Sequence, residues 1–202
     1  RTAQYRTSFD EQRCLQLARG WVSAKIRNQK VFLRRNWREE QPPAEIITQL
    51  DAAERNARHA DSLESLLGHE GSAAAAYFGA FGSLLRTDTA PGFQFQFQDR
   101  NRRPPRDPVN AMLSFAYALL TRQWTVTLAT VGFDVHRGFY HQPRYGRPSL
   151  ALDMLEPFRP IVADSAVLKA VNNGEVRPSD FTSAGGAVSL KEDGRKRFIA
   201  AF

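Results

Sequence analysis

Helix signals recur along most of this sequence, whereas strand signals are almost absent. The strongest start signal is Asp107-Pro108, because aspartate is a good N-cap residue and proline suits the first helical position. Apolar residues then recur at helical spacing from Leu113 to Leu128, and the pattern stops at Gly132. A chain of 202 residues, 42% of them hydrophobic, can bury a sizeable core. We therefore predict one all-α, multi-helix domain that spans residues 1–202.

Capping residues and proline breaks set the expected helix boundaries. A capping box at Ser8-Phe9-Asp10-Glu11 predicts the start of a long first helix, and Pro42-Pro43 breaks it. Ser149 is the expected cap of a later helix that can continue to Asn172. The expected elements are helices at about 8–37, 44–58, 61–86, 108–132 and 149–172, a loop at 87–106 with one short extended piece at 93–98, a strand at 187–190 and a terminal helix from about 191.

Positive charge is concentrated in three parts of the sequence. Lys and Arg total 28 against 21 Asp and Glu, a net charge of +7. Clustered cations release counterions from a phosphate backbone, so they indicate a polyanionic partner such as nucleic acid. For any single cluster, a solvated basic surface is the alternative. The clusters are Lys25, Arg27, Lys30, Arg34, Arg35 and Arg38; Arg100, Arg102, Arg103 and Arg106; and Arg144, Arg147 and Arg159.

The cysteine content and the apolar runs bear on the cellular compartment. Cys14 is the single cysteine, which excludes an intramolecular disulfide and fits a reducing compartment. The sequence has no signal peptide and no run of about 18 apolar residues. We therefore expect a soluble, cytoplasmic protein with no membrane contact. Because the sequence starts with Arg1 rather than methionine, we also expect it to be a piece of a longer polypeptide.

One histidine and three carboxylates are the candidates for chemistry. His141 lies in a Gly/Pro-rich loop, and the helix expected after it carries Asp153 and Glu156 three positions apart, on one face. Glu70 lies in an otherwise small and apolar helix, where a charge is costly unless it is paired or bound to a metal. Imidazole and carboxylates suit Mg²⁺ or Mn²⁺ with open positions better than a closed structural zinc site. We interpret this set as a catalytic hard-metal centre with Glu70 as its third carboxylate.

Each of these residues also has a simpler interpretation. Asp153 and Glu156 could form a solvated stripe, since most acids are exposed, and His141 could be an ordinary hydrogen-bonded histidine. The apolar neighbours of the two acids favour a core helix whose acids line a cleft. His69 faces about 100° away from Glu70 on a helix, so we expect it beside the site or on the surface. The sequence has no Gly-rich phosphate loop, no His-Glu-x-x-His motif and no serine elbow.

Four blocks of the sequence, together with the segment 24–29, resemble a known family. They follow in the family's order with similar gaps, and they cover nearly the whole chain. The chain is similar to the CRISPR-associated spacer integrases and endonucleases, the first-numbered Cas proteins. The blocks are Leu67-Gly68-His69-Glu70-Gly71 through Tyr77-Phe78, the run from Arg102 to Tyr117, Gly138-Phe139-Tyr140-His141, and the run from Ser149 to Pro160.

The resemblance implies an architecture and a set of partners. Family members have a small N-terminal β domain and a larger helical catalytic domain, and the β domain is not in this sequence. They assemble as homodimers around a dimer of the second-numbered Cas protein. Some are fused to a reverse transcriptase or to another Cas domain, so such an upstream domain is one expectation here. The expected substrate is double-stranded DNA, namely the spacer and the CRISPR repeat.

The resemblance also implies an activity and assigns residues to it. The family carries out metal-dependent integration, in which a 3′-hydroxyl of the spacer attacks a phosphodiester at the repeat. By similarity, Glu70, His141 and Glu156 are the metal ligands and Asp153 is a nearby catalytic acid. Arg159 is expected to face DNA, and Arg102, Arg103, Arg106 and Arg147 are expected to bind its phosphates.

Two alternatives from other classes remain open at this point. The first is a non-catalytic helical module that binds DNA or acts as a scaffold, with structural acids. The second is a metal-dependent nuclease of another pathway. Dependence of strand transfer on a divalent metal separates integration from the scaffold, and use of a 3′-hydroxyl rather than water separates it from a nuclease.

Overall fold

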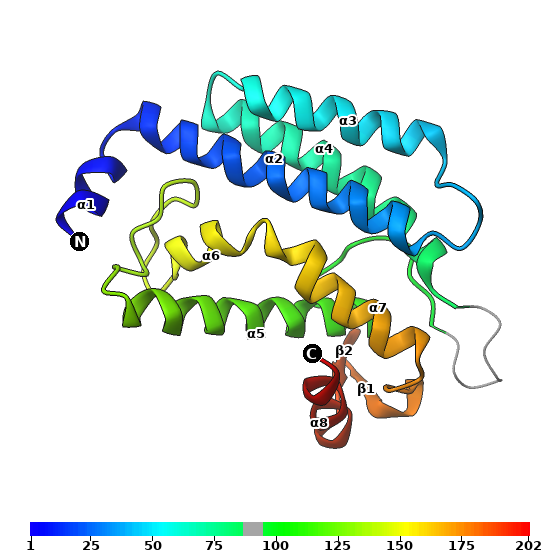
Figure 1. The fold of residues 1–202 in the computed structure, drawn as a ribbon. Coiled ribbons are helices and arrows are strands. Elements are labelled where there is room, and N and C mark those ends of the chain that lie inside the picture. Colours follow the sequence, from blue (N-terminus) through cyan, green and yellow to red (C-terminus); the bar gives the residue numbers. More distant parts are fainter. Residues whose placement is uncertain (87–94) are drawn as a thin grey trace.

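The computed structural model describes residues 1–86 and 95–202, and these residues are mainly helical (Figure 1). The all-α prediction is confirmed, because their single sheet is an antiparallel pair of short strands. In this part of the chain, no helix is both long and apolar enough to cross a membrane. The elements are α1 (Thr2–Ser8), α2 (Glu11–Asn36), α3 (Ala44–His59), α4 (Leu63–Phe81), α5 (Pro108–Thr130), α6 (Ser149–Leu155), α7 (Ser165–Asn172), β1 (Phe181–Ala184), β2 (Ala187–Leu190) and α8 (Glu192–Ala201).

Helices α2, α3 and α4 pack against one another and form the upper layer in Figure 1. Their contact is apolar, with Ile26 of α2, Leu50 of α3 and Leu66 of α4 fully buried. The sequence places such residues at helical spacing, so one face of each helix is removed from water. The predicted boundaries of α3 are confirmed to within one residue.

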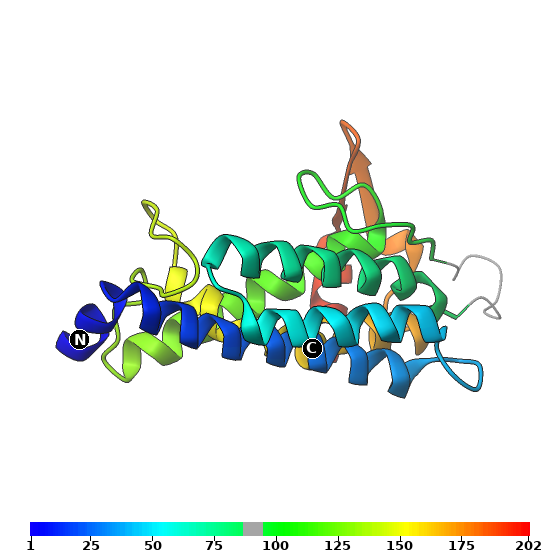
Figure 2. The same ribbon diagram turned by 90° about the horizontal axis from the view of Figure 1, so that it is seen from above.

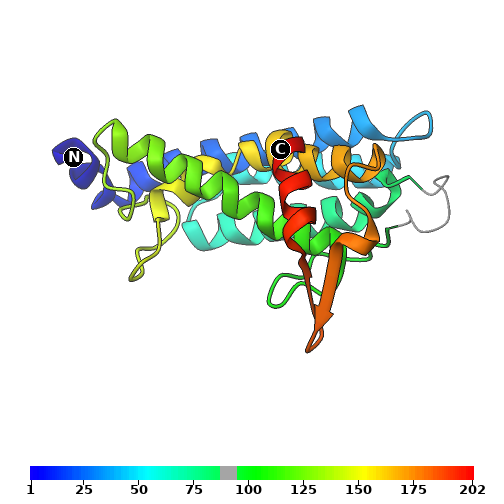
Figure 3. The same cartoon turned by 90° about the horizontal axis from the view of Figure 1, so that it is seen from below.

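Helix α5 forms a second layer with α6 and α7. Its predicted start is confirmed, since the Asp107 carboxylate accepts a hydrogen bond from the Asn110 backbone N–H at 2.8 Å. The loop before α5, the loop between α5 and α6, and the β1–β2 hairpin all project from the same side of the helices (Figures 2 and 3). These connections therefore border one face of the molecule.

The predicted start of the first long helix is wrong by a few residues. Ser8 ends the separate helix α1, and its hydroxyl donates to the Tyr5 carbonyl at 2.8 Å. Asp10 caps α2 instead, accepting from the Arg13 backbone N–H at 3.1 Å. Two capping residues lie two positions apart here, and the sequence pattern does not distinguish them. Helix α4 likewise ends at Phe81, followed by a 3₁₀ turn over Gly82–Leu84, rather than near residue 86.

The predicted continuous helix over 149–172 is also wrong. The N-cap position belongs to Pro148 rather than Ser149, and α6 ends at Leu155. Pro157 and Pro160 lack the N–H groups that a helix interior needs, and a π-helical turn over Arg159–Asp164 leads into α7. Glu156 is consequently the C-cap residue of a short helix, not a residue of a helix interior.

The C-terminal part agrees with the sequence prediction in two elements and adds a third. The strand at 187–190 and the terminal helix are present as β2 and α8. The partner strand β1 was not predicted, and Gly185 and Gly186 turn the hairpin with φ of 57° and 76°. Part of the extended piece expected at 93–98 falls at 87–94, outside the described residues, and 95–98 is not a strand.

Candidate active site

Two carboxylates from distant parts of the sequence meet at one cation. Glu70 projects from the middle of α4 and Glu156 from the end of α6, and the Lys25 ammonium of α2 contacts both. Lys25 Nζ lies 2.8 Å from Glu156 Oε2 and is also paired with Glu70 Oε1. The side chains of Glu156 and Glu70 are 2% and 14% exposed. Charges buried to this extent need partners, and the convergence of three helices supplies them.

The local charges keep this cluster ionised. Burial opposes ionisation of Glu156, but the Arg159 and Lys25 cations lower the pKa of this carboxyl to about 2. Burial likewise opposes the charge on Lys25, and here the Glu156 and Glu70 carboxylates prevail and raise the pKa of the ammonium. Glu156 is therefore a carboxylate and Lys25 an ammonium at neutral pH.

His141 is held beside this pair by Asp153. Its Nδ1 lies 2.8 Å from Asp153 Oδ1, and the Asp153 carboxylate also accepts hydrogen bonds from the backbone N–H groups of Phe139, Tyr140 and His141. Asp153 is fully buried. A proton on Nδ1 directed at this carboxylate leaves Nε2 with a free lone pair, and Nε2 lies 3.8 Å from Glu156 Oε1. Asp153 thus positions the histidine and its loop.

The same loop also reaches Glu70. The Tyr140 hydroxyl donates to Glu70 Oε2, so both oxygens of Glu70 have partners. Burial and the neighbouring Glu70 charge raise the pKa of Tyr140, which keeps the hydroxyl protonated as a donor. Residues 139–141 therefore tie α4 to α6 through side chains and backbone.

The three predicted ligands lie together, and their donor types suit a hard divalent ion. Two carboxylates already share one positive charge, and an imidazole nitrogen lies close to one of them. The Lys25 ammonium, however, lies between Glu70 and Glu156. Within residues 1–86 and 95–202, no three His, Cys, Asp or Glu side chains are spaced as they would be around a bound metal. The metal role of Glu70, His141 and Glu156 stays a prediction.

A cleft of about 770 Å³ opens onto these residues. Arg102, Arg147 and Arg159, which the sequence marked for DNA contact, line it together with the carboxylate pair. Arg103 and Arg106 lie on the same loop as Arg102, exposed and outside the lining. Arg100, of the same cluster, is engaged internally, because its guanidinium donates to Asn110 and Ser114. Positive charge at the rim and negative charge at the floor make the cleft suited to a phosphate backbone beside a cation site.

Arg159 serves the site itself as well as the rim. Its Nη2 lies 3.1 Å from Glu156 Oε1, and its guanidinium lies over the Tyr117 ring, 4.7 Å from the centroid. The side chain is 16% exposed. The pairing with Glu156 was not predicted, and the DNA contact of Arg159 stays a prediction.

Part of the basic cluster of α2 pairs with acids of the fold, and its contact with DNA stays a prediction. Arg27 pairs with Glu54 at 3.1 Å, and Lys30 pairs with Glu54 and Asp51. Lys25 belongs to the carboxylate pair. Arg34, Arg35 and Arg38 of the same cluster are exposed, as are Arg102, Arg103 and Arg106 of the loop before α5.

Two tyrosines hold one further carboxyl, Asp164, which also lines the cleft. The Tyr77 and Tyr117 hydroxyls donate to Asp164 at 2.9 and 2.6 Å, and Asp164 is 1% exposed. Burial raises the pKa of Asp164 to about 6, although both hydroxyls and the Arg159 cation act in the opposite direction. Since Tyr117 carries Arg159 on its ring, this network supports the floor of the site.

The raised pKa of Asp164 predicts a pH-dependent stability. The folded protein holds the Asp164 proton more tightly than the unfolded chain, so this contribution is complete below about pH 4 and is lost as the pH rises to about 6. The shift corresponds to about 3 kcal/mol in the free energy of unfolding. Denaturant unfolding of wild type and Asp164→Asn between pH 4 and pH 7 measures it, and wild type should lose about this much relative to the variant. Parallel pH curves would contradict the prediction.

Lys25, Tyr140, Tyr117 and Asp164 were missed as site residues in the sequence. For Lys25 a signal existed, because it lies three positions after Val22 and seven after Ala18. It therefore falls on the apolar face of α2, where a lysine needs a buried partner. Nothing comparable in the local pattern marks the others.

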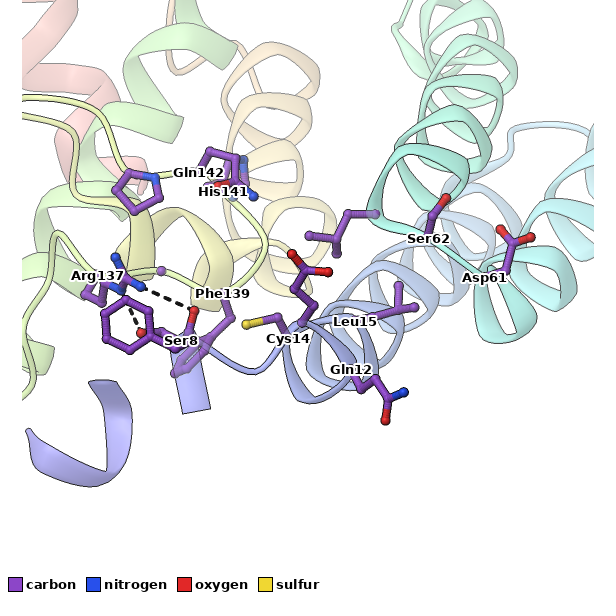
Figure 4. A pocket seen from close by; sticks show the side chains of 15 residues that line it. Ser8, Gln12, Cys14, Leu15, Asp61, Ser62, Arg137, Phe139, His141 and Gln142 are labelled. Carbon is purple, nitrogen blue, oxygen red and sulfur yellow. Dashed lines mark hydrogen bonds between the residues drawn. The ribbon is translucent and has the colours of Figure 1, made fainter. Parts of the chain in front are cut away.

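A second pocket, of about 560 Å³, lies on another side of His141. Its lining comes from the start of α2, the start of α4 and the loop after α5, as Figure 4 shows for Leu15, Ser62 and Gln142. The Arg137 guanidinium borders it and donates to the Ser8 hydroxyl at 2.6 Å. Among the described residues, His141 is the one that borders both pockets.

Comparison with known proteins tests the resemblance. The sequence profile of the family described as "CRISPR associated protein Cas1" matches residues 1–202. A "CRISPR-associated exonuclease Cas4/endonuclease Cas1 fusion" of Geobacter sulfurreducens is 57% identical over 206 residues, which cover 100% of this chain and 37% of that protein. The chain thus spans little more than a third of this relative's length.

Two solved structures share the fold. One, "Partial Cas6-RT-Cas1--Cas2 complex", matches with a TM-score of 0.87 and 27% identity over 97% of this chain and 58% of the other. A second, "Casposase bound to integration product", matches with a TM-score of 0.83 and 27% identity over 99% of this chain and 55% of the other. The resemblance seen in the four sequence blocks is confirmed, and the chain belongs to the Cas1 family of CRISPR-associated proteins.

Proposed function

We propose that this chain forms the strand-transfer site of a metal-dependent DNA integrase that inserts spacer DNA into a CRISPR array. The observation that carries the proposal is the convergence of Glu70 and Glu156 on one cation, with His141 Nε2 beside them, at the floor of a cleft with an arginine-rich rim. A scaffold role accounts for a buried ion pair but not for its opening, together with His141, onto an arginine-lined cleft. A cleft that binds phosphate next to a cation site suits phosphodiester chemistry.

The chain's own residues position the reactants. Arg102 and Arg147 at the rim bind phosphates and hold the repeat strand without reading its sequence. Asp153 orients His141, and Arg159 stabilises the charge of Glu156. A Mg²⁺ or Mn²⁺ ion held by Glu70, His141 and Glu156 would supply Lewis-acid polarisation of the phosphoryl group. The spacer 3′-oxygen forms a bond to phosphorus and gives its proton to water, while the displaced 3′-oxygen of the repeat leaves and takes a proton from water.

The partners of relatives support a larger assembly for this chain. The Geobacter relative is a fusion with Cas4, and the solved complex contains Cas2, Cas6 and RT segments. We propose that the chain works as a homodimer with a dimer of Cas2 on double-stranded spacer and repeat DNA. We further propose that a β domain lies upstream of this chain in the full-length protein, joined to Cas4, a reverse transcriptase or another Cas domain.

A strand-transfer assay tests the reaction. The complete protein with Cas2 is given a short duplex and a repeat-containing plasmid, in Mg²⁺ or Mn²⁺ and in a chelator. A free 3′-hydroxyl should give a joined product that contains the duplex, and a 3′-dideoxy end should give none. Joining in the chelator would contradict metal dependence. Cleavage without joining would instead identify a nuclease of another pathway.

The loop arginines provide a test of DNA binding. Replacing Arg102, Arg103 and Arg106 by alanine should weaken binding to unrelated duplexes alike, because phosphate contacts carry no sequence information. The slope of log affinity against log salt should become shallower by about 0.9 for each lost phosphate contact. Lys196→Ala, which removes a charge from α8, is the control and should leave the slope unchanged. An unchanged slope in the triple variant would show that these arginines form a solvated surface.

A further inference from the structure

Lys25 occupies the point at which the two site carboxylates meet. Its ammonium pairs with Glu70 Oε1 and lies 2.8 Å from Glu156 Oε2, and its side chain is 10% exposed. Lys25 also lines the cleft, so the ammonium has a route from the carboxylates toward a ligand. Its four-carbon stem can change rotamer without moving α2.

The charges around this point already balance. Glu70 and Glu156 contribute two negative charges, and Lys25 and Arg159 contribute two positive charges. Asp153 does not add to the pair, because its carboxylate is engaged by His141 and by three backbone N–H groups. Asp164, which also lines the cleft, is engaged by the Tyr77 and Tyr117 hydroxyls. A divalent ion entering here would therefore bring two positive charges that the Glu70–Glu156 pair, already matched by Lys25 and Arg159, does not compensate. An incoming phosphodiester would supply a compensating negative charge.

Arg159 and Lys25 differ in their freedom to move. Arg159 is fixed between the Glu156 carboxylate and the Tyr117 ring. Within residues 1–86 and 95–202, the Lys25 ammonium is held by the two carboxylates alone, so an ion that binds those oxygens releases it. Lys25 is therefore the cation that a divalent ion displaces from the carboxylates.

We propose that Lys25 is the resident counter-ion of the Glu70–Glu156 pair and that a divalent ion must displace it toward the cleft, where a DNA phosphate receives it. This inference rests on the proposed function in taking the two carboxylates as metal ligands. It predicts that metal and DNA bind cooperatively, each raising the affinity of the other by the same factor. Lys25 thereby links occupation of the metal site to the presence of substrate.

Mn²⁺ binding measures this coupling without turnover. The complete protein is titrated with Mn²⁺, and free Mn²⁺ is followed by electron paramagnetic resonance, with and without a duplex that has 3′-dideoxy ends. In wild type the duplex should raise Mn²⁺ affinity by at least about fivefold, the lower range of such couplings. Lys25→Met should bind Mn²⁺ at least about fivefold more tightly than wild type without DNA, and the duplex should add less. Lys25→Arg keeps the charge and should not show this gain.

Two controls locate the effect. Lys30→Met removes another α2 lysine from a pair of acids, Asp51 and Glu54, that do not line the cleft. It should leave Mn²⁺ affinity at the wild-type value. Adding Glu70→Gln to Lys25→Met should remove the gain, because one of the two carboxylates is lost.

The outcomes separate this inference from the proposed function. If Mn²⁺ binds wild type in a Glu70-dependent way but no more tightly to Lys25→Met, the inference is wrong and the proposed function stands. If neither protein binds Mn²⁺ with or without DNA, the metal-dependent function itself is wrong. Circular dichroism checks that each variant is folded. If Lys25→Met is unfolded both with and without Mn²⁺, Lys25 is a structural residue and the inference is wrong. Recovery of its fold by Mn²⁺ would support the inference.

Discussion

Replacing His141 by alanine should abolish strand transfer while DNA binding survives. The imidazole is held by Asp153 with Nε2 directed to the carboxylate pair, so its loss removes the nitrogen donor of the proposed ion site. We expect a loss of at least about 10²–10³-fold, the range for removing one group that stabilises charge in a transition state. The rim arginines are unchanged, so the affinity for duplex DNA should stay near wild type.

The assay for His141→Ala uses the complete protein with Cas2 and a duplex with free 3′ ends in Mg²⁺ or Mn²⁺. His69→Ala is a matched control, because His69 is next to Glu70 in sequence and its Nε2 instead lies 3.4 Å from the Ser65 hydroxyl. This control should integrate at the wild-type rate. If His141→Ala also does so, the catalytic assignment of His141 is wrong; absence of joining by wild type would instead favour the DNA-binding scaffold.

Replacing Gly138 by alanine should disable the site from a position that carries no functional group. A Cβ at Gly138 would lie 2.8 Å from Asp153 Oδ2 and 2.9 Å from the Ser149 backbone carbon. Backbone cannot yield as a flexible side-chain end can, so the loop that carries His141 must shift and lose its hydrogen bonds to Asp153. A misplacement of about 1 Å can reduce the rate about 10²-fold. Overpacking should also lower the free energy of unfolding by about 1–3 kcal/mol.

The effect of Gly138→Ala on activity is measured as the strand-transfer rate well below the melting temperature. Its effect on the free energy of unfolding is measured by denaturant unfolding. Gly20→Ala is the control, since Gly20 lies exposed in α2 and a Cβ there meets no atom within 4 Å. Alanine in a helix interior is about 0.5–1 kcal/mol more favourable than glycine, so this variant should be as active as wild type and slightly more stable. Wild-type activity and stability in Gly138→Ala would show that the loop tolerates the added atom.

Most helices could be predicted from the sequence because their signals are local. Asp107-Pro108 starts α5 as expected, and α4, capped by Ser62, begins within two residues of its expected start at 61, since a cap depends on a few adjacent residues. The errors arose where two local signals compete. Ser8 and Asp10 both qualify as caps, and the apolar pattern across Pro157 and Pro160 concealed the break between α6 and α7.

Three acids and the histidine of the site could be predicted, but Asp164 and the ion-pairing role of the cations could not. Glu70 and His141 were marked by chemistry out of keeping with their neighbours, and the structure brings both to Glu156. Arg159 and Lys25 were assigned to a DNA-facing surface, and the structure adds that each pairs with a site carboxylate. The number of basic residues in a segment does not reveal which of them have acidic partners on other helices.

What the sequence determined by itself is the helical class, most of the helix boundaries and the residue types able to bind a hard cation. These follow from propensity, capping and periodicity, which act over a few residues. Only the tertiary structure decided that α2, α4 and α6 place Lys25, Glu70 and Glu156 at one point. It also decided that Asp153 holds the loop of His141. Such contacts depend on how helices pack across long sequence separations, and the burial that makes their charges strong exists only after packing.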